Sequence, residues 1–230
     1  MKGYRGIILI ALAMAVSATA TANSRDQAQR IHNRLAGVPA DAATLTEMAQ
    51  LIDNNQVAEA AELAMDNPAF YNVTIKQFAT PWTNEAQDVF APLNDYTATI
   101  IGVVRDDVDF RRILYSDLLY VGNASPAASP SSNAHYQALE DQHADLSTVL
   151  TESSQASQYG TPAEAVAGVL TTRAAANAFF YAGTNRAMLR FTMMNHMCRD
   201  LEQVKDTTRP SDRIRQDVSR SPGGDSRIFR

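Results

Sequence analysis

Residues 94–104, NDYTATIIGVV, decide whether the centre of the chain is a buried helix or a buried strand. Their β-branched side chains suit a strand, but no other stretch offers an evident partner strand. We therefore predict a buried helix that begins near Asp95. With this prediction the fold class is all-α.

Four further helices are predicted before this stretch. Residues 24–27 (SRDQ) have the spacing of a capping box, so the first helix should run to about Leu35. Residues 44–47 (TLTE) repeat that spacing, and residues 56–65 (QVAEAAELAM) are rich in alanine. A fourth helix should begin at Pro68. The predicted core comprises Phe70, Phe78, Trp82, Ile100, Ile101, Ile113 and Leu118.

The rest of the chain is predicted to be helical with one clear break. Residues 110–119 should form a helix, and residues 122–133 (GNASPAASPSSN) a linker or a long loop. The break separates an N-terminal helical region, 23–121, from a C-terminal one, 134–204. In the latter we expect a polar helix over residues 135–150 and another that begins at residues 161–164 (TPAE).

The two ends of the chain differ from this body. Residues 1–22 have the positive head, short apolar run and small-residue cleavage site of a signal peptide. We therefore expect a periplasmic or secreted protein with no stable membrane span after cleavage. Residues 205–230 are charged and poor in apolar side chains, which predicts a flexible tail. The expected architecture is a multi-helix orthogonal or bundle-like domain followed by this tail.

Charge and cysteine content exclude several classes of protein. The formal net charge is −5, and removal of Lys2 and Arg5 with the leader makes it −7. An acidic chain is a poor candidate for binding nucleic acid, which requires a cationic face. Cys198 is the only cysteine, so no internal disulfide can form and no c-type haem can be attached through two thioethers.

The best candidate for a metal site is residues 191–198 (FTMMNHMC). Thioether, imidazole and thiolate are soft ligands that suit copper or a haem iron. The alternative is a buried helix in which methionine and cysteine fill the core. The candidate ligands are Met193, Met194, His196, Met197 and Cys198.

A second candidate is the predicted helix that carries His135, Glu140 and His143. Glu140 and His143 have the Glu-x-x-His spacing of di-iron bundles, but those sites need a second copy and further carboxylates. A solvated helix face is the alternative. The sequence has no nucleophile elbow, phosphate loop or zinc-protease motif, so the balance is against an enzyme, and no cofactor is assigned.

Several segments resemble a family of large secreted bacterial proteins related to planctomycete-type cytochromes. The resemblance lies in residues 168–173 (GVLTTR), residues 183–186 (GTNR) and the helix that ends near Cys198. Residues 67–82 and 110–119 resemble that family's helical domains of unknown function. In those proteins a Cys-x-x-Cys-His haem motif follows, and this chain reaches Arg230 without one. The resemblance implies an exported helical protein near electron-transfer proteins, and no haem ligand is carried over.

Three functional hypotheses follow. The first is an exported, non-enzymatic helical protein that is a partner or accessory domain in a periplasmic redox assembly. The second is a metal-binding protein that uses the ligands named above. The third is a truncated fragment of a longer c-type cytochrome-like protein.

Overall fold

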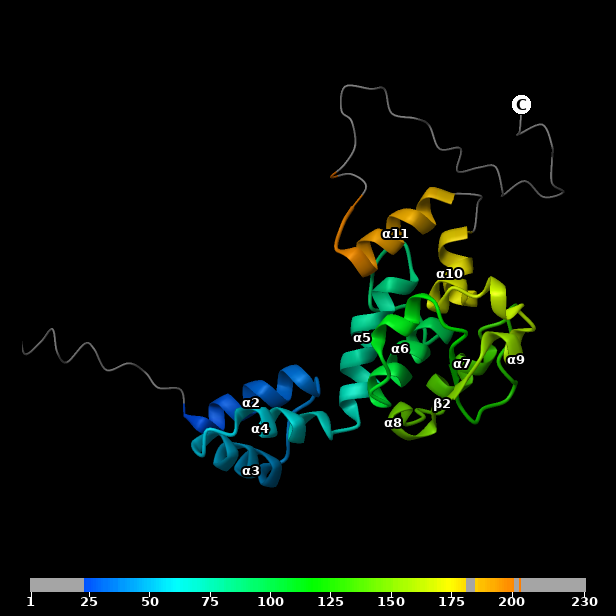
Figure 1. Cartoon of the computed structure of the whole chain (residues 1–230). Coiled ribbons are helices and arrows are strands. Elements are labelled where there is room, and N and C mark those ends of the chain that lie inside the picture. Colours follow the sequence, from blue (N-terminus) through cyan, green and yellow to red (C-terminus); the bar gives the residue numbers. More distant parts are fainter. Residues whose placement is uncertain (1–22, 181–184, 201–202, 204–230) are drawn as a thin grey trace, which may run out of the picture. The chain divides into compact units, whose positions relative to one another are not determined.

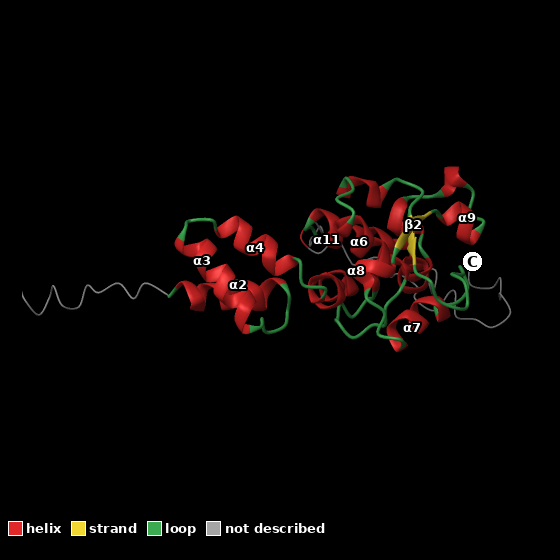
Figure 2. Cartoon of the chain, turned by 90° about the horizontal axis from the view of Figure 1, so that it is seen from below, coloured by secondary structure: helices red, strands yellow, loops and turns green. Residues whose placement is uncertain are grey.

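The computed structural model describes residues 23–180, 185–200 and 203. The chain divides into two compact units, Met1–Asp66 and Asn67–Arg230 (Figure 1). Helices dominate both units, which confirms the predicted all-α class (Figure 2). The predicted signal peptide, residues 1–22, and the predicted tail, residues 205–230, lie outside the described residues.

The first unit consists of α2 (Ser24–Leu35), α3 (Ala42–Asp53) and α4 (Val57–Met65). All three helices were predicted, but the first two begin earlier than the capping boxes suggested. Asn23 caps α2 by accepting a hydrogen bond from the Arg25 N–H, and Asp41 caps α3 in the same way. Asparagine and aspartate are as effective at this position as serine or threonine.

The core of the first unit is small and rich in alanine. Ala28, Met48, Ala60 and Ala64 are buried together, with larger aliphatic side chains around them. His32 is also buried, and its Nδ1 lies 2.9 Å from the Val38 carbonyl oxygen. This hydrogen bond ties the end of α2 to the turn that follows, so His32 has a structural role.

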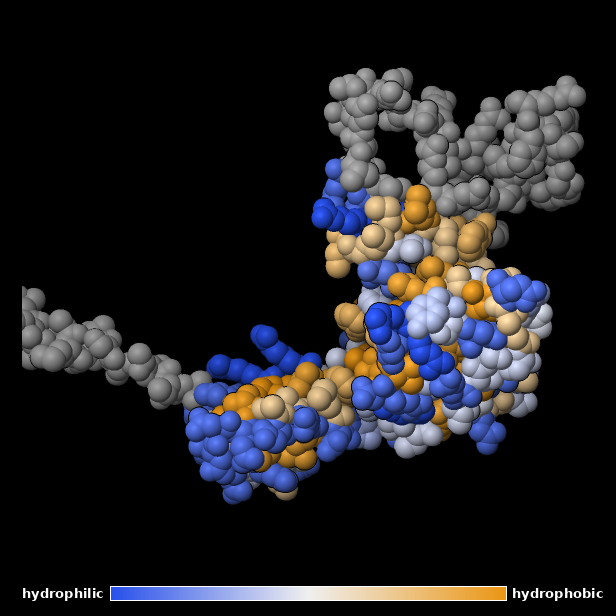
Figure 3. All heavy atoms as spheres, viewed as in Figure 1, coloured by the Kyte–Doolittle hydropathy of each residue, from blue (hydrophilic) through white to orange (hydrophobic). Residues whose placement is uncertain are grey.

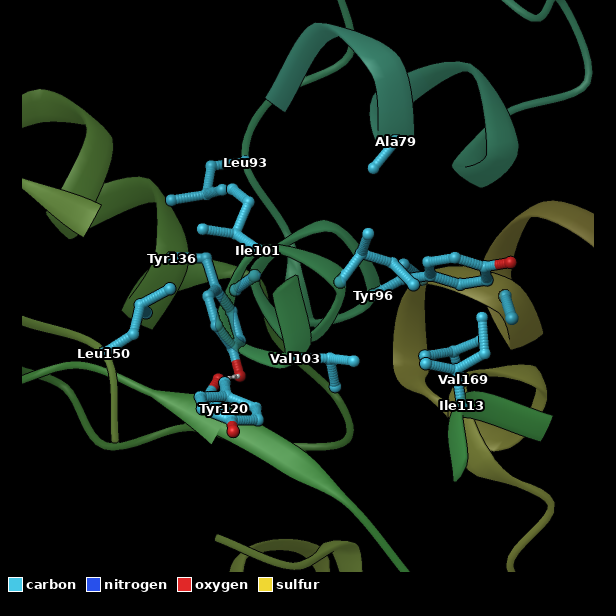
Figure 4. Close-up of a cluster of buried hydrophobic side chains, with 14 of the residues drawn as sticks. Ala79, Leu93, Tyr96, Ile101, Val103, Ile113, Tyr120, Tyr136, Leu150 and Val169 are labelled. Carbon is cyan, nitrogen blue, oxygen red and sulfur yellow. Dashed lines mark hydrogen bonds between the residues drawn. The ribbon is translucent and has the colours of Figure 1, made fainter. Parts of the chain in front are cut away.

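The second unit is built around α6 (Asp95–Arg105), which confirms the central prediction. The Asn94 side chain caps this helix by accepting from the Thr97 N–H, and every residue from Asp95 to Val103 is buried. Figure 4 shows apolar side chains from several elements around α6, with the Tyr136 hydroxyl donating to the Tyr120 carbonyl oxygen. A Cβ on Gly102 would lie 2.1 Å from the Tyr120 ring, so glycine permits this close approach.

The other helical segments of the second unit are short, except for α11. These are the π-helical η1 (Phe70–Ile75) and η6 (Ala176–Phe180), the 3₁₀ turns η2 (Thr80–Thr83), η3 (Phe110–Leu114), η4 (Ala163–Ala165) and η5 (Gly168–Thr171), and the α-helices α5 (Lys76–Ala79), α7 (Ala134–Asp141), α8 (Leu146–Val149), α9 (Gln155–Tyr159), α10 (Arg173–Ala175) and α11 (Asn185–Met197).

The prediction of a helix over residues 110–119 is wrong. The chain makes only the turn η3, and then the strand β1 (Leu119–Val121) pairs antiparallel with β2 (Thr151–Ser153). Leu119 and Tyr120 are buried between this pairing and α6, and large apolar residues of this kind suit a strand. The partner strand lies about thirty residues further along the chain, so the local sequence pattern could not predict the pairing.

The break at residues 122–133 is a loop inside the second unit, and the chain divides instead at Asp66. Asn133 fixes the end of the loop, because its amide donates to the Leu93 carbonyl oxygen at 2.8 Å. Its own oxygen accepts from the Arg173 guanidinium at 2.7 Å. The regions 23–121 and 134–204 are therefore not separate bodies.

Two other predicted helices are shorter than expected. The helix over residues 135–150 is interrupted at His143, whose φ is +51°, and is split into α7 and α8. Residues 161–164 begin only the turn η4, because Val166 is extended and Gly168 has a φ of +54°. Of the predicted core residues, Phe78 is 58% exposed and Trp82 is partly buried, whereas the others are buried.

A buried carboxylate joins α6 to the C-terminal part of the second unit. Asp95 Oδ1 accepts from the Ala174 N–H at 3.0 Å, and Oδ2 accepts from the Arg173 N–H at 2.7 Å. The Tyr159 hydroxyl donates to Oδ2 at 3.0 Å. Burial raises the pKa of Asp95, and these donors and the Arg173 charge oppose that shift. From the first turn of α6, the carboxylate thus accepts the first two N–H groups of α10.

We expect Asp95→Asn to destabilise the protein by about 2–4 kcal/mol, because an amide cannot accept all of these donors and leaves buried N–H groups unpaired. Urea unfolding followed by circular dichroism measures the change. Asp107→Asn is the matched control, since Asp107 is exposed and its φ of +51° suits asparagine. Equal stability of the two variants would contradict the role given to Asp95.

Candidate functional site

The predicted metal ligands lie on or just after α11, whose N-terminal half packs on the core. Phe191 is buried, and its ring stacks on Phe179 with the centroids 4.6 Å apart. Phe179 belongs to η6, which continues directly from α10. Phe179 is thus buried against α11, whereas Tyr181, the second residue after it, lies outside the described residues.

The C-terminal end of α11 is held by two aromatic residues from earlier in the chain. His196 Nε2 lies 2.9 Å from the Tyr96 hydroxyl oxygen. The Trp82 ring meets the His196 ring edge-on, with centroids 5.4 Å apart. The Asn195 amide donates to the Trp82 carbonyl oxygen at 3.2 Å. His196 therefore faces the protein, where it closes a small aromatic cluster.

The electrostatics of this cluster favour a neutral imidazole. Burial lowers the pKa of His196 below its ordinary value, because the charged ring would lose solvation. Burial also raises the pKa of Tyr96, so its hydroxyl keeps its proton and can donate. The consistent arrangement is a Tyr96 O–H that donates to Nε2, with the imidazole proton on Nδ1.

The other candidate ligands point to different surroundings. Met193 and Met194 are half-buried, whereas Met197 is 63% exposed and Cys198 is exposed. Cys198 has a φ of +51° and lies just beyond the helix, where the Arg199 N–H donates to the Met193 carbonyl oxygen. The inward imidazole and the exposed thiol do not form one ligand set in this structure. Among the described residues no three His, Cys, Asp or Glu side chains are grouped as a metal site.

In the second candidate set, His135 and Glu140 make hydrogen bonds or ion pairs within the protein. His135 is buried, with Nδ1 2.8 Å from the Pro126 carbonyl oxygen and Nε2 accepting from the Gly122 N–H. Glu140 forms an ion pair with Lys76 and accepts from the Leu93 N–H. His143, Glu140 and Lys76 line a cavity of about 340 Å³. Both nitrogens of His135 are thus used within the protein.

The acidic run near residues 106–109 also has structural partners. The Asp109 carboxylate accepts from the Arg111 N–H and caps η3. Its pairing with the Arg111 guanidinium lowers the pKa of Asp109 to about 2. Asp106 accepts from the Tyr120 hydroxyl and from Arg105. These carboxylates have no arrangement that suggests calcium binding.

No family model, no curated protein and no solved structure matches this chain. Within the described part of the chain, no helix has the length and apolar character needed to cross a bilayer.

The sequence singled out His196 but not the residues that position it. Tyr96 and Trp82 precede His196 by about a hundred residues, and a contact of this kind leaves no local pattern. Trp82 was predicted to lie in the core. It is only partly buried there, and its ring also contacts His196 of α11.

We expect protonation of His196 to destabilise the protein below about pH 6.5, which is the ordinary pKa of histidine. Because the folded state holds the pKa of His196 below that value, the unfolded state binds the proton first, and the stability present above pH 6.5 is lost as pH falls. Urea unfolding at pH 7.5 and pH 5 measures the loss, and His196→Gln should reduce it. An unchanged pH dependence in this variant would contradict the assignment.

The metal hypothesis stays a prediction and has a direct test. If Met193, Met194, His196, Met197 and Cys198 bind copper, protein purified from the periplasm should carry about one equivalent of it. His196→Gln should then lose the metal, whereas His143→Gln should retain it. Elemental analysis that finds less than about a tenth of an equivalent in the wild type would contradict the hypothesis.

Proposed function

We propose that this chain is an exported, non-enzymatic helical protein that acts as a partner or accessory domain in a periplasmic redox assembly. The observation that carries the proposal is the exposed apolar surface of α11 and η6. Leu189 is 55% exposed, Met197 63% and Phe180 49%. Side chains of this size on an ordered helical end are typical of contact surfaces for other proteins.

Apolar residues gather at this end of the second unit. Figure 3 shows orange and pale-orange residues over the part formed by α10 and α11. The segment is ordered by internal contacts, because Phe191 stacks on Phe179 and His196 contacts Tyr96. A surface that is already ordered loses less conformational entropy when a partner binds.

The sequence supports the cellular setting of the proposal. The leader predicts export, and the resemblance to cytochrome-related secreted proteins suggests a redox partner. The acidic net charge favours a basic protein over nucleic acid or an anionic lipid surface.

Cys198 provides the test, because it is exposed and is the only cysteine in the chain. A photoreactive maleimide on Cys198, activated in intact periplasm, should cross-link the protein to a haem protein. The adduct is identified by haem staining and by mass spectrometry. The expected result is a haem-positive band of higher mass than either protein alone.

A matched control places the cross-linker elsewhere. The variant Cys198→Ser/Glu59→Cys carries one exposed thiol on α4 of the first unit and should give little haem-positive adduct. Equal labelling by both proteins, or no haem-positive adduct from Cys198, would overturn the proposal.

A further inference from the structure

The loop over residues 84–93 presents the most exposed aromatic side chain of the described residues. Phe90 is 89% exposed, and the neighbouring Val89 is also exposed. Neither residue is needed for the core of the second unit. A loop that exposes large apolar side chains in this way is expected to be mobile unless other contacts fix it.

Both ends of the loop are fixed. The Asn94 amide donates to Thr83 Oγ1 at 3.1 Å and closes the base. Leu93 is buried; its N–H donates to Glu140 Oε2 at 3.0 Å, and its carbonyl oxygen accepts from Asn133 at 2.8 Å. A segment of this length with neighbouring, hydrogen-bonded ends has the form of an Ω-loop.

Two side chains brace the interior of the loop. The Asn84 amide donates to the carbonyl oxygens of Thr80 and Asp88, each at 3.0 Å, and its oxygen accepts from the Asp88 N–H at 3.1 Å. Asp88 Oδ1 in turn accepts from the Phe90 N–H at 2.8 Å. The backbone that carries Phe90 is therefore held in position while its ring remains in solvent.

The charge around Phe90 indicates the kind of partner. Glu85 and Asp88 are exposed, and residues 84–93 contain no lysine or arginine. This combination fits a surface with an apolar centre and a cationic rim. A second copy of the loop would bring like charges together, and an anionic membrane would repel the two carboxylates.

We propose that the loop over residues 84–93 is a docking site for a redox protein whose apolar cofactor edge is ringed by lysine or arginine. Phe90 contacts the apolar centre, and Glu85 and Asp88 face the cationic rim. A braced loop loses little entropy on binding, so one aromatic anchor contributes a large share of the affinity. This inference rests on the proposed function, because the occupant that it names is the redox partner of that function.

The probe is a soluble, basic c-type cytochrome, titrated against the full chain by isothermal calorimetry at low salt. Saturable binding is expected, with Phe90→Ser weakening it about tenfold or more. Asp88→Asn keeps an oxygen that can accept from the Phe90 N–H but removes the charge, so it should weaken binding about threefold and reduce the salt dependence. Asn84→Ala, which loosens the loop but keeps Phe90, should also weaken binding.

Tyr115→Ser is the matched control, because Tyr115 is an exposed aromatic residue elsewhere in the same unit. It should bind the cytochrome like the wild type, and thermal melts of all the variants should agree to within a few degrees. Binding that is absent in the wild type or unchanged in Phe90→Ser overturns the inference. Phe90-dependent self-association or vesicle binding in place of cytochrome binding overturns it as well.

The cross-linking experiment separates the two proposals. If Phe90→Ser still gives the haem-positive adduct through Cys198 at the wild-type level, the loop is not the docking site but the redox-partner function stands. If the wild type gives no such adduct, the proposed function fails independently of the loop.

Discussion

The second unit depends on the buried carboxylate of Asp95. A charge without solvent costs several kcal/mol unless donors surround it, and here two backbone N–H groups, the Tyr159 hydroxyl and the Arg173 charge do so. The two N–H groups belong to Arg173 and Ala174, the first residues of α10. Because α10 continues directly into η6, the same contact helps to position Phe179. Phe191 of α11 stacks on Phe179, and the candidate helix is therefore positioned through Asp95.

Features of the fold that arise from local physics could be predicted from the sequence. The helix from Asp95 and the helices of the first unit follow from side chains within a few residues. The β1–β2 pair could not be predicted, because Tyr120 gains its burial from α6 and from a strand thirty residues later. Nor could the requirement for glycine at position 102 be predicted, since it comes from the ring of Tyr120, which is distant in the sequence.

The candidate site was predicted only in part for the same reason. Their ligand chemistry brought Met193, His196 and Met197 to attention, but the sequence of one helix does not tell which side chain faces a neighbour. Tyr96 and Trp82 determine that His196 faces inward, and the surface exposure of Met197 follows from it. The loop at Phe90 has a clearer local signature, since Asn84 and Asp88 are residues that brace turns through their side chains.

One short turn supports both of the exposed apolar features. In η2, the Thr80 carbonyl oxygen accepts from Asn84, which braces the loop, and the Trp82 carbonyl oxygen accepts from Asn195 at the end of α11. Because both contacts use the backbone of the same turn, a shift of η2 would displace the Phe90 loop and the end of α11 together. The positions of the two exposed apolar features therefore depend on the same short turn.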